Sequence, residues 1–318
     1  MPEGVTMDIQ AAARRFKANV EQAVIGRSDV VELIFVALLC EGHVLIEDVP
    51  GVGKTLLARA TARSVDGSFK RIQCTPDLLP SDVVGIHFFN QKTSAFEFRP
   101  GPVMANVVLV DEINRAMPRT QSCLLESMQE RQVTVDWDTV ALPRPFLLMA
   151  TQNPIELEGT FPLPEAQLDR FLFRLKLGYP CPQDEFNVLT RYQKDNPIDH
   201  LASVIGTAEQ LAMQIQVRQV LVADPLRHYI LSLTRATREH PDIHLGASTR
   251  AALGLQAASQ ALAACRGRAF VIPDDVKALA DAVLSHRIVV RTEARLKART
   301  EEDIIRETIA ATAVPVEP

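Results

Sequence analysis

The stretch His43-Val-Leu-Ile-Glu-Asp-Val-Pro-Gly-Val-Gly-Lys-Thr55 decides how this chain folds. A short apolar run leads into a Gly-rich turn, Lys-Thr follows, and an alanine- and leucine-rich segment continues to Val65 as a predicted helix. A phosphate-binding P-loop requires this strand–loop–helix order, because glycines let successive backbone N–H groups face phosphate oxygens. The start of the helix adds unpaired N–H groups and the positive end of a dipole. The stretch therefore predicts an α/β domain that binds a nucleotide.

Individual positions of the loop predict individual contacts. Lys54 can reach the β- and γ-phosphates of ATP, and the Thr55 hydroxyl can ligate Mg²⁺. The strict pattern G-x-x-x-x-G-K-[ST] has glycine at position 48, where this chain has aspartate. A glycine-rich turn that merely starts a helix would leave the Lys-Thr pair unexplained. The residues that we expect to bind the nucleotide here are Asp48, Pro50, Gly51, Val52, Gly53, Lys54, Thr55 and Leu56.

Composition narrows the class of protein. The chain has 318 residues, of which 47% are hydrophobic, and a net charge of −5. Lys and Arg form no long stripe, which argues against a general nucleic-acid coat. The five cysteines form no C-x-x-C pair, so we expect free thiols in a reducing compartment and neither disulfides nor a zinc site. With no signal-peptide pattern and no apolar stretch long enough for a bilayer, we expect a cytoplasmic protein without membrane insertion.

Between residues 43 and 178, short apolar segments alternate with helical ones. This alternation is typical of a parallel sheet with helices on both faces. The expected strands are 43–47, 69–74, 107–110, 145–151 and 171–177. Two further segments, 82–103 and 131–142, alternate in polarity around polar centres and are predicted to be inserted β-hairpins. The only tryptophan, Trp137, lies in the second hairpin; we expect a core anchor, with an exposed substrate-contacting tip as the alternative.

The pattern changes after Tyr179. Helical periodicity dominates at 224–239, 248–266, 273–286 and 299–311, and the one strand signal is a short segment near 216–222. We therefore predict an α/β nucleotide-binding domain over 1–180, a linker over 181–222 and a smaller all-helical domain over 223–318.

Two strand ends carry polar residues suited to phosphate chemistry. Val107-Val-Leu-Val-Asp111-Glu112 is an apolar strand that ends in two carboxylates. Because ligands of such folds bind at the carboxyl edge of the sheet, we expect Asp111 to hold Mg²⁺ and Glu112 to activate the attacking water as general base. Asn153 ends a later strand and can hydrogen-bond the γ-phosphate. The alternative for Asn153 is a turn residue before proline.

Three arginines are candidates for stabilising transition-state charge. Arg170 precedes the last strand, and in a ring it could meet the γ-phosphate held by the next subunit. The alternative is a surface pair with Asp169, which contributes little. Arg174 is a second candidate for the same role. Arg250 lies in the first turn of a helix capped by Ser248, where a cation opposes the helix dipole and hints at a phosphate partner.

Taken together, these motifs resemble the AAA+ ATPases and, within them, the MoxR family. The resemblance extends over nearly the whole chain, and Asp at position 48 is also common in that family. The strings that carry the resemblance are Leu45-Ile-Glu-Asp-Val-Pro-Gly-Val-Gly-Lys-Thr55, Cys74-Thr-Pro-Asp-Leu-Leu-Pro-Ser-Asp82, Val110-Asp-Glu-Ile-Asn-Arg115, Ala150-Thr-Gln-Asn-Pro154, Leu163-Pro-Glu-Ala-Gln-Leu-Asp-Arg-Phe171 and Leu284-Ser-His-Arg287.

The resemblance implies an α/β nucleotide domain, a helical lid, inserted hairpins, and a hexameric ring with ATP at the subunit interfaces. It implies that Ile25 and Gly26 lie near the adenine, and it leaves open which subunit's ATP Arg250 serves. The remaining roles that it implies are Walker A for Lys54 and Thr55, Walker B for Asp111 and Glu112, sensor 1 for Asn153, arginine finger for Arg170 and sensor 2 for Arg250.

Relatives in the family are described as chaperone-like motors that work with von Willebrand factor A domain proteins. The leading hypothesis is therefore an ATP-hydrolysing ring that remodels a protein client. One alternative is a DNA-dependent, helicase-like motor, which the nearly neutral charge of the hairpin segments disfavours. The charged residues considered in and next to these segments are Lys92, Glu97, Arg99, Arg131, Asp136, Asp138 and Arg144. Another alternative is an ATP-gated binding switch with little turnover, which has no need of a general base such as Glu112.

Overall fold

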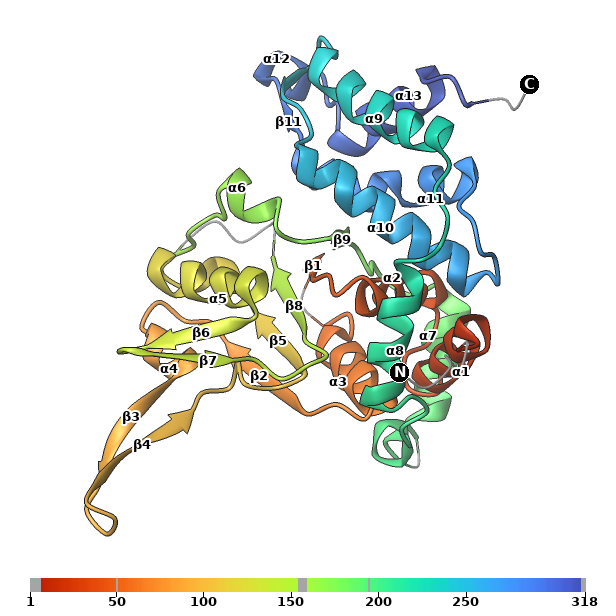
Figure 1. Cartoon of the computed structure of the whole chain (residues 1–318). Coiled ribbons are helices and arrows are strands. Elements are labelled where there is room, and N and C mark those ends of the chain that lie inside the picture. Colours follow the sequence, from red (N-terminus) through yellow and green to blue (C-terminus); the bar gives the residue numbers. More distant parts are fainter. Residues whose placement is uncertain (1–6, 50, 154–158, 194, 316–318) are drawn as a thin grey trace.

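A five-stranded parallel sheet forms the centre of the molecule (Figure 1). The computed structural model describes residues 7–49, 51–153, 159–193 and 195–315. The strand order is β2-β5-β8-β1-β9, and every neighbouring pair is parallel. The strands are β1 (Val44–Glu47), β2 (Phe69–Gln73), β5 (Val107–Asp111), β8 (Leu147–Gln152) and β9 (Phe173–Leu175). The predicted parallel sheet is thus confirmed, strand by strand.

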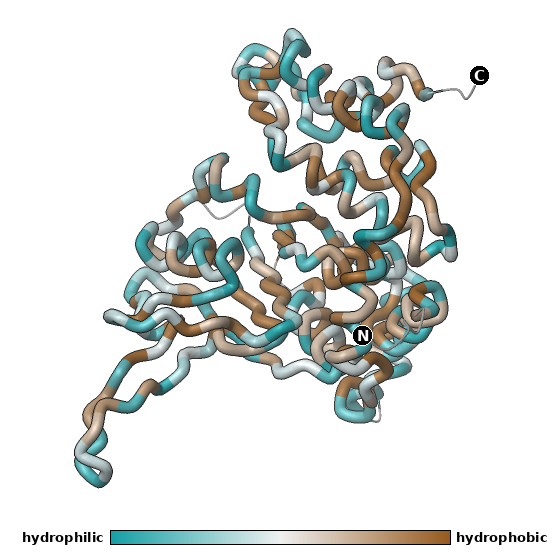
Figure 2. The backbone as a smooth tube through the Cα atoms, in the orientation of Figure 1, coloured by the Kyte–Doolittle hydropathy of each residue, from teal (hydrophilic) through white to brown (hydrophobic). Residues whose placement is uncertain are grey.

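Helices cover both faces of this sheet and make two apolar cores. Strand β5 is buried along its whole length, as expected for an apolar strand in a parallel sheet covered on both sides. Figure 2 shows the apolar strands running through the interior of the domain. The helical elements of this part are α1 (Ile9–Val20), α2 (Ser28–Leu39), α3 (Lys54–Ser64), α4 (Pro80–Val84), η1 (Ile113–Arg115), α5 (Pro118–Glu130) and α6 (Glu165–Leu168).

Two antiparallel hairpins extend from the sheet domain, as the alternating segments predicted. The first pairs β3 (Gly85–Asn90) with β4 (Ala95–Pro100), and the second pairs β6 (Gln132–Val135) with β7 (Asp138–Ala141). The β3–β4 hairpin projects away from the body of the molecule (Figure 1, lower left). It carries exposed apolar side chains, namely Ile86, Phe88, Phe89 and Phe96.

Trp137 is not the core anchor that we expected. Its side chain is 74% exposed at the tip of the β6–β7 hairpin. The indole stacks on the ring of His87 from the other hairpin, with centroids 5.8 Å apart and planes 8° from parallel. The two ring nitrogens of His87 lie 3.1 Å from Asp136 Oδ2 and 3.3 Å from Asp138 Oδ2. Trp137 therefore finds its packing partner on the neighbouring hairpin, outside both cores.

The segment between the sheet domain and the C-terminal helices is itself largely helical. Its elements are α7 (Pro182–Arg191), η2 (Pro197–His200) and α8 (Thr207–Val217). The predicted strand near 216–222 is wrong, because the chain is helical to Val217 and only Leu221 forms a bridge, to Phe270. Gln214 of α8 donates to the Leu38 carbonyl at 2.7 Å, which fixes this segment against α2. The boundaries of the linker stay a prediction.

The C-terminal region is the predicted helical unit, with one small strand pair that the sequence did not signal. Its helices are α9 (Asp224–Glu239), α10 (Thr249–Cys265), α11 (Pro273–Leu284), η3 (Ser285–Arg287), α12 (Thr292–Arg295) and α13 (Glu301–Ala311). Strands β10 (Ile243–Leu245) and β11 (Val289–Val290) pair antiparallel, too short to show a period in sequence. Among the described residues, no helix combines the length and the apolarity that crossing a membrane requires.

Asp169, at the end of α6, joins the sheet domain to the helical region. Its carboxylate lies 3.0 Å from Arg287 Nε and accepts a hydrogen bond of 3.0 Å from Ser248 Oγ. Arg287 also donates to the Phe171 carbonyl at 2.6 Å. Burial lowers the pKa of Arg287 to about 10, and the Asp169 carboxylate opposes that shift. This ion pair is therefore mostly withdrawn from water, unlike the surface pair considered from sequence.

We expect Asp169→Ala to lower the free energy of unfolding by about 3 kcal/mol, because it leaves the Arg287 guanidinium buried without its counter-ion. Urea unfolding followed by circular dichroism measures the change. Asp195→Ala is the matched control, since the Asp195 side chain is 61% exposed and we expect a change within about 0.5 kcal/mol. Equal stability of the two variants would show that the Asp169 pair contributes nothing.

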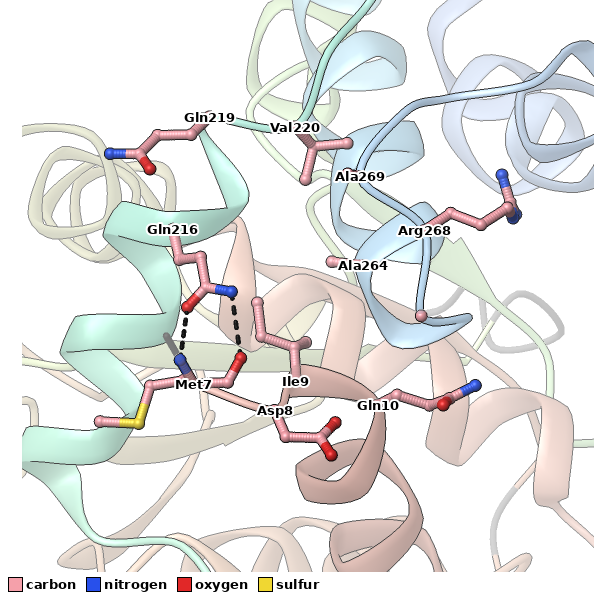
Figure 3. A pocket seen from close by; sticks show the side chains of 11 residues that line it. Met7, Asp8, Ile9, Gln10, Gln216, Gln219, Val220, Ala264, Arg268 and Ala269 are labelled. Atoms are coloured by element: carbon pink, nitrogen blue, oxygen red, sulfur yellow. Dashed lines mark hydrogen bonds between the residues drawn. The ribbon is translucent and has the colours of Figure 1, made fainter. Parts of the chain in front are cut away.

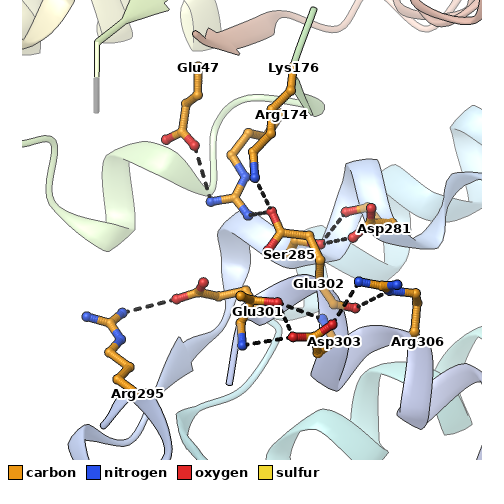
Figure 4. A network of polar contacts seen from close by, with 11 residues as sticks. Glu47, Arg174, Lys176, Asp281, Ser285, Arg295, Glu301, Glu302, Asp303 and Arg306 are labelled. Atoms are coloured by element: carbon orange, nitrogen blue, oxygen red, sulfur yellow. Dashed lines mark hydrogen bonds and ion pairs between the residues drawn. The ribbon is translucent and has the colours of Figure 1, made fainter. Parts of the chain in front are cut away.

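A second ionic contact joins the helical region to the strand that precedes the P-loop (Figure 4). Arg174 of β9 lies 3.5 Å from Glu47 Oε2 at the end of β1 and 3.0 Å from Glu302 Oε1 of α13. Lys176 reaches the same oxygen of Glu302 at 2.7 Å. The Arg174 side chain is only 14% exposed, so its two ion pairs are partly shielded from water. One guanidinium thus links the nucleotide domain to the helical region.

Candidate active site

A cavity of about 410 Å³ lies at the carboxyl edge of the sheet, beside the P-loop. It brings together residues that the sequence places on separate strand ends. Its lining residues are Gly51, Gly53, Lys54, Thr55, Leu56, Arg71, Gln73, Asp111, Glu112, Thr151 and Asn153. The predicted Lys-Thr pair, the two carboxylates and the strand-end asparagine therefore face one space.

The glycines of the loop adopt a backbone that other residues avoid. Gly51 has φ 86° and Gly53 has φ 90°, both in the left-handed region. No atom lies within 4 Å of a Cβ built at either position, so space is open beside the loop backbone. Helix α3 begins at Lys54, directly after Gly53, and its first N–H groups have no intrahelical partner. Pro50 lies outside the described residues.

Asp48 fixes the entrance of the loop and does not line the cavity. Its buried carboxylate accepts hydrogen bonds from Gly178 N at 2.6 Å and from Val49 N at 2.8 Å. Its carbonyl oxygen accepts a hydrogen bond of 2.9 Å from Lys54 Nζ. The residue that departs from the strict motif thus ties the loop to the segment that follows β9, and it orients the lysine through its main chain.

Asp111 ends β5 and is buried, with both carboxylate oxygens engaged. Thr151 of β8 donates through Oγ1 to Asp111 Oδ1 at 3.0 Å. Arg71 of β2 donates through Nε to Asp111 Oδ2 at 2.6 Å. The Asp111 side chain is only 9% exposed, whereas that of Arg71 is 49% exposed. The carboxylate is therefore held rigidly by its own neighbours, and the arginine approaches it from the solvent side.

Glu112 follows in the left-handed region, with φ 56°. Its backbone N–H donates to Thr151 Oγ1 at 2.9 Å, which fixes the turn after β5. Its side chain accepts a hydrogen bond of 2.9 Å from Gln73 Nε2 and lies 3.4 Å from Arg115 Nε. A non-glycine residue in this conformation carries strain that the surrounding contacts must offset. The strained turn aims the Glu112 side chain into the same cavity as Lys54.

A second cavity, of about 420 Å³, adjoins the other side of the loop and is largely apolar. It contains Ile25, Gly51, Val52, Gly53 and Leu56 from the predicted set, whereas Gly26 does not line it and has φ 72°. A Cβ on Gly26 would fall 2.3 Å from Asp184 Oδ2, so glycine lets α7 approach here. The other lining residues are Ala23, Val24, Arg27, Tyr179, Pro180, Glu185, Val188 and Tyr192. The pair of cavities suits a ligand with a flat apolar end and an anionic end.

The candidate arginines do not line either cavity. Arg170 is half-buried and donates to the Leu125 carbonyl at 2.9 Å. Arg250 lies 3.5 Å from Asp169 Oδ2, at the junction with the helical region. Arg174 is held between its two glutamates. The structure thus brings the loop, carboxylate and asparagine positions together within one chain, and it leaves Arg170 and Arg250 apart from them.

Sequence reasoning missed several polar residues of the two cavities, among them Arg71, Gln73, Thr151 and Tyr192. Arg71 and Gln73 alternate along β2 and so share one face, and Thr151 lies two residues before Asn153 on β8. A period-2 reading of β2 would have found the first two. Tyr192 comes from the segment expected as a linker; its hydroxyl donates to the Ala23 carbonyl at 3.1 Å.

A larger cavity lies where the chain's first helix meets α8 and the turn after α10 (Figure 3). Its volume is about 470 Å³. Gln216 bridges the main chain of Met7 there, donating to its carbonyl at 3.0 Å and accepting from its N–H at 2.9 Å. Both polar atoms of the Gln216 amide are therefore already hydrogen-bonded within the chain. No strand end or P-loop residue lines this cavity, so it is not the candidate active site.

The oxygen donors of the first cavity fit Mg²⁺. The Thr55 hydroxyl and the Asp111 carboxylate are hard ligands facing one space. In the part of the chain that the structure describes, no group of three or more His, Cys, Asp or Glu side chains is arranged to hold a metal ion alone. Mg²⁺ in proteins commonly binds through one or two carboxylates together with substrate phosphates, which agrees with this small donor set.

Comparison with known proteins agrees with the fold and the cavity. A family model described as the ATPase family associated with various cellular activities (AAA) matches residues 43–173. A model of the AAA lid domain matches residues 235–308. A crystal structure of a Cytophaga hutchinsonii protein, described as a candidate ATPase, superposes with a TM-score of 0.91 at 36% identity over 97% of this chain and 96% of that one. The fold and the matches define an AAA ATPase with a lid.

Relatives by sequence give the family within that class. Chaperone MoxR1 of Mycobacterium tuberculosis is 41% identical over 98% of this chain and 85% of its own length. The Bacillus subtilis protein YeaC, described as uncharacterized, is 50% identical over 94% of this chain and 93% of its own length. This chain therefore belongs to the MoxR family. An MCM homologue of Methanopyrus kandleri, with 15% identity and a TM-score of 0.58, shares the fold alone.

Proposed function

We propose that this chain hydrolyses ATP to ADP and phosphate in a ring of identical subunits, and that the cycle remodels or matures a partner protein. One observation carries the proposal: Lys54, Thr55, Asp111, Glu112 and Asn153 line a single cavity beside the P-loop. Each supplies a separate requirement of phosphoryl transfer, namely phosphate binding, metal binding, water activation and γ-phosphate recognition.

The P-loop binds the phosphates and the neighbouring apolar cavity takes the adenine. Backbone N–H groups of Gly51 to Thr55 and the Lys54 ammonium provide donors and positive charge for the phosphate oxygens. Ile25, Val52 and Leu56 give the base an apolar surface, with Gly26 allowing α7 to close it. Thr55 and Asp111 would hold Mg²⁺, which when bound neutralises charge on the β- and γ-phosphates.

Glu112 accepts the proton of the attacking water, and Asn153 hydrogen-bonds the γ-phosphate. The rigid turn at Glu112 supports this role because a general base must be aimed before the reaction begins. The sensor role of Asn153 rests on its place directly beyond β8, beside the Asp111 strand end. Neither residue needs a large movement of the sheet, since both belong to strand termini fixed by the buried core.

Arg170 acts on the ATP of the adjacent subunit in this proposal. Its separation from the P-loop cavity of its own chain supports a shared site, and so does the absence of Arg250 from that cavity. Whether Arg250 serves its own subunit's nucleotide or a neighbour's stays open. A hexameric ring is the arrangement that the family resemblance implies, and it would place each finger against the next nucleotide.

We expect Arg170→Ala to keep ATP binding and to lose about 10³-fold in turnover, because transition-state charge loses its cation. ATPase assays over a range of protein concentrations measure this. Arg174→Ala is the comparison for the alternative finger; since Arg174 is held by Glu47 and Glu302, we expect a smaller loss. A larger loss in Arg174→Ala than in Arg170→Ala would reverse the assignment.

Mixing two inactive variants tests the shared site directly. In a mixed ring of Arg170→Ala and Glu112→Gln subunits, some interfaces combine an intact Glu112 with an intact Arg170. We therefore expect activity to return on mixing, above the sum of the separate variants. If mixing restores nothing while mixed rings form, Arg170 does not act between subunits.

The client is proposed to be a protein, contacted by the β3–β4 hairpin. Its exposed Ile86, Phe88, Phe89 and Phe96 suit an apolar polypeptide segment better than a phosphate backbone. A helicase-like motor and an ATP-gated switch remain the alternatives. A Glu112→Gln pull-down in ATP, with Lys54→Ala as control, separates the proposal from the helicase: a client or von Willebrand factor A domain protein supports the proposal, and co-purifying DNA supports the helicase. Steady ATP turnover by the wild type separates the proposal from the switch.

A further inference from the structure

Arg71 has a position that none of the motifs explains. It lies on the edge strand β2, lines the P-loop cavity, and places Nε 2.6 Å from Asp111 Oδ2. Its Nη2 donates to Gln73 Oε1 at 2.7 Å, so the guanidinium is held from two sides. Phosphate-binding sites use cations to bind anions, yet this cation is aimed at the carboxylate expected to bind the metal.

The contact leaves neither oxygen of the Asp111 carboxylate without a partner. Thr151 already donates to Oδ1, and Arg71 donates to Oδ2, so both carboxylate oxygens have partners within the chain. A divalent cation at the same carboxylate would face the positive guanidinium at close range, and like charges repel strongly at such distances in a partly buried site. Arg71 and the metal thus compete for one ligand.

Arg71 also has the freedom to leave. Its side chain is 49% exposed, and β2 is an edge strand of the sheet. Nucleotide phosphates in the same cavity would offer the released guanidinium a stronger anionic partner, because its planar fork matches phosphate oxygens. Nucleotide binding can therefore draw the Arg71 guanidinium away from Asp111 and leave that carboxylate to the metal ion.

We propose that Arg71 shields Asp111 from free divalent cations and yields it only when a nucleotide enters, so that metal and nucleotide bind cooperatively. This inference rests on the proposed function, in which Asp111 is the metal ligand. Its consequence is selectivity for the metal–nucleotide complex over the free metal. By reciprocity, the nucleotide raises the metal affinity by the same factor as the metal raises the nucleotide affinity.

The test uses Mn²⁺ as the probe, with binding followed by electron paramagnetic resonance on the full chain. We expect Arg71→Gln, which removes the charge and keeps hydrogen bonding, to bind Mn²⁺ about tenfold more tightly than wild type without nucleotide. With saturating ADP the difference should shrink, so that the coupling between Mn²⁺ and ADP falls about tenfold. Lys70→Gln is the matched control: Lys70 is adjacent, exposed and on the opposite face of β2, and this variant should match wild type.

Two further variants make the outcome decisive. Arg71→Lys keeps the charge, and its Mn²⁺ affinity should stay close to that of wild type. Adding Asp111→Asn to Arg71→Gln should abolish the Mn²⁺ binding that Arg71→Gln gains. The inference is overturned if Arg71→Gln binds Mn²⁺ no more tightly than wild type, or if Arg71→Lys tightens binding equally. Failure of the proposed function has a different signature: wild type would bind neither ADP nor ATP, at any Mn²⁺ concentration.

Discussion

Replacing Lys54 by alanine is expected to weaken ATP binding by at least about 100-fold. The ammonium can make charge-assisted hydrogen bonds to the β- and γ-phosphates, each contributing about 1.5–3 kcal/mol. In the structure the same ammonium donates to the Asp48 carbonyl at 2.9 Å, so its position is set by the loop itself. Isothermal titration calorimetry with ATP and Mg²⁺ measures the change.

Lys92→Ala provides the control for this experiment. Lys92 is exposed in the turn of the β3–β4 hairpin and carries the same charge, so its loss leaves the P-loop untouched. We expect its ATP affinity to equal that of wild type. An unchanged affinity in Lys54→Ala would show that the loop does not grip phosphates through this lysine, and the assignment of the cavity would fail with it.

The second large effect is expected from Glu112→Gln, which should bind ATP normally and hydrolyse it about 10²–10⁴-fold more slowly. The amide keeps the shape of the side chain but cannot take a proton from water. Gln73 and Arg115, which contact the carboxylate, can still place hydrogen bonds on the amide oxygen. Single-turnover measurement of phosphate release separates slow chemistry from slow product release.

Glu239→Gln, at the exposed end of α9, makes the same chemical change far from the cavity in sequence and should turn over ATP like wild type. Wild-type turnover in Glu112→Gln would exclude Glu112 as the base. Weak ATP binding in this variant would instead mean that the carboxylate supports the site's structure, because binding should not depend on a group that acts only on water.

The sheet could be predicted from sequence because its strands are buried on both faces. Val107 to Val110 is apolar without interruption, and only a covered parallel strand needs such a run. The hairpins were predictable from alternation. In β6–β7 the alternation reflects a packed face, since Val133 and Val135 are buried, whereas the β3–β4 hairpin keeps its apolar side chains largely exposed. The short β10–β11 pair was not, since strands of three and two residues are too brief to show any period.

Side-chain pairing across distant segments was the part that sequence could not supply. Trp137 was misjudged because its partner, His87, lies on another hairpin and is joined to it only by the fold. For Asp169 the sequence offered only a surface pair with Arg170, as the alternative to the finger role, yet Asp169 forms an ion pair with the buried Arg287, far along the chain. Arg71 was overlooked because a strand arginine carries no motif. Its importance becomes visible only in the structure, where its guanidinium binds the Asp111 carboxylate.

Arg174 has a mechanical consequence. It is shared by Glu47, which leads into the P-loop, and by Glu302, which begins a lid helix. Moving the lid away would separate Arg174 from Glu302 before water can fully solvate either group, and an unpaired charge in such a place costs free energy. Intermediate orientations of the lid are therefore disfavoured. We expect the lid to occupy a few discrete angles relative to the nucleotide domain and not a continuous range.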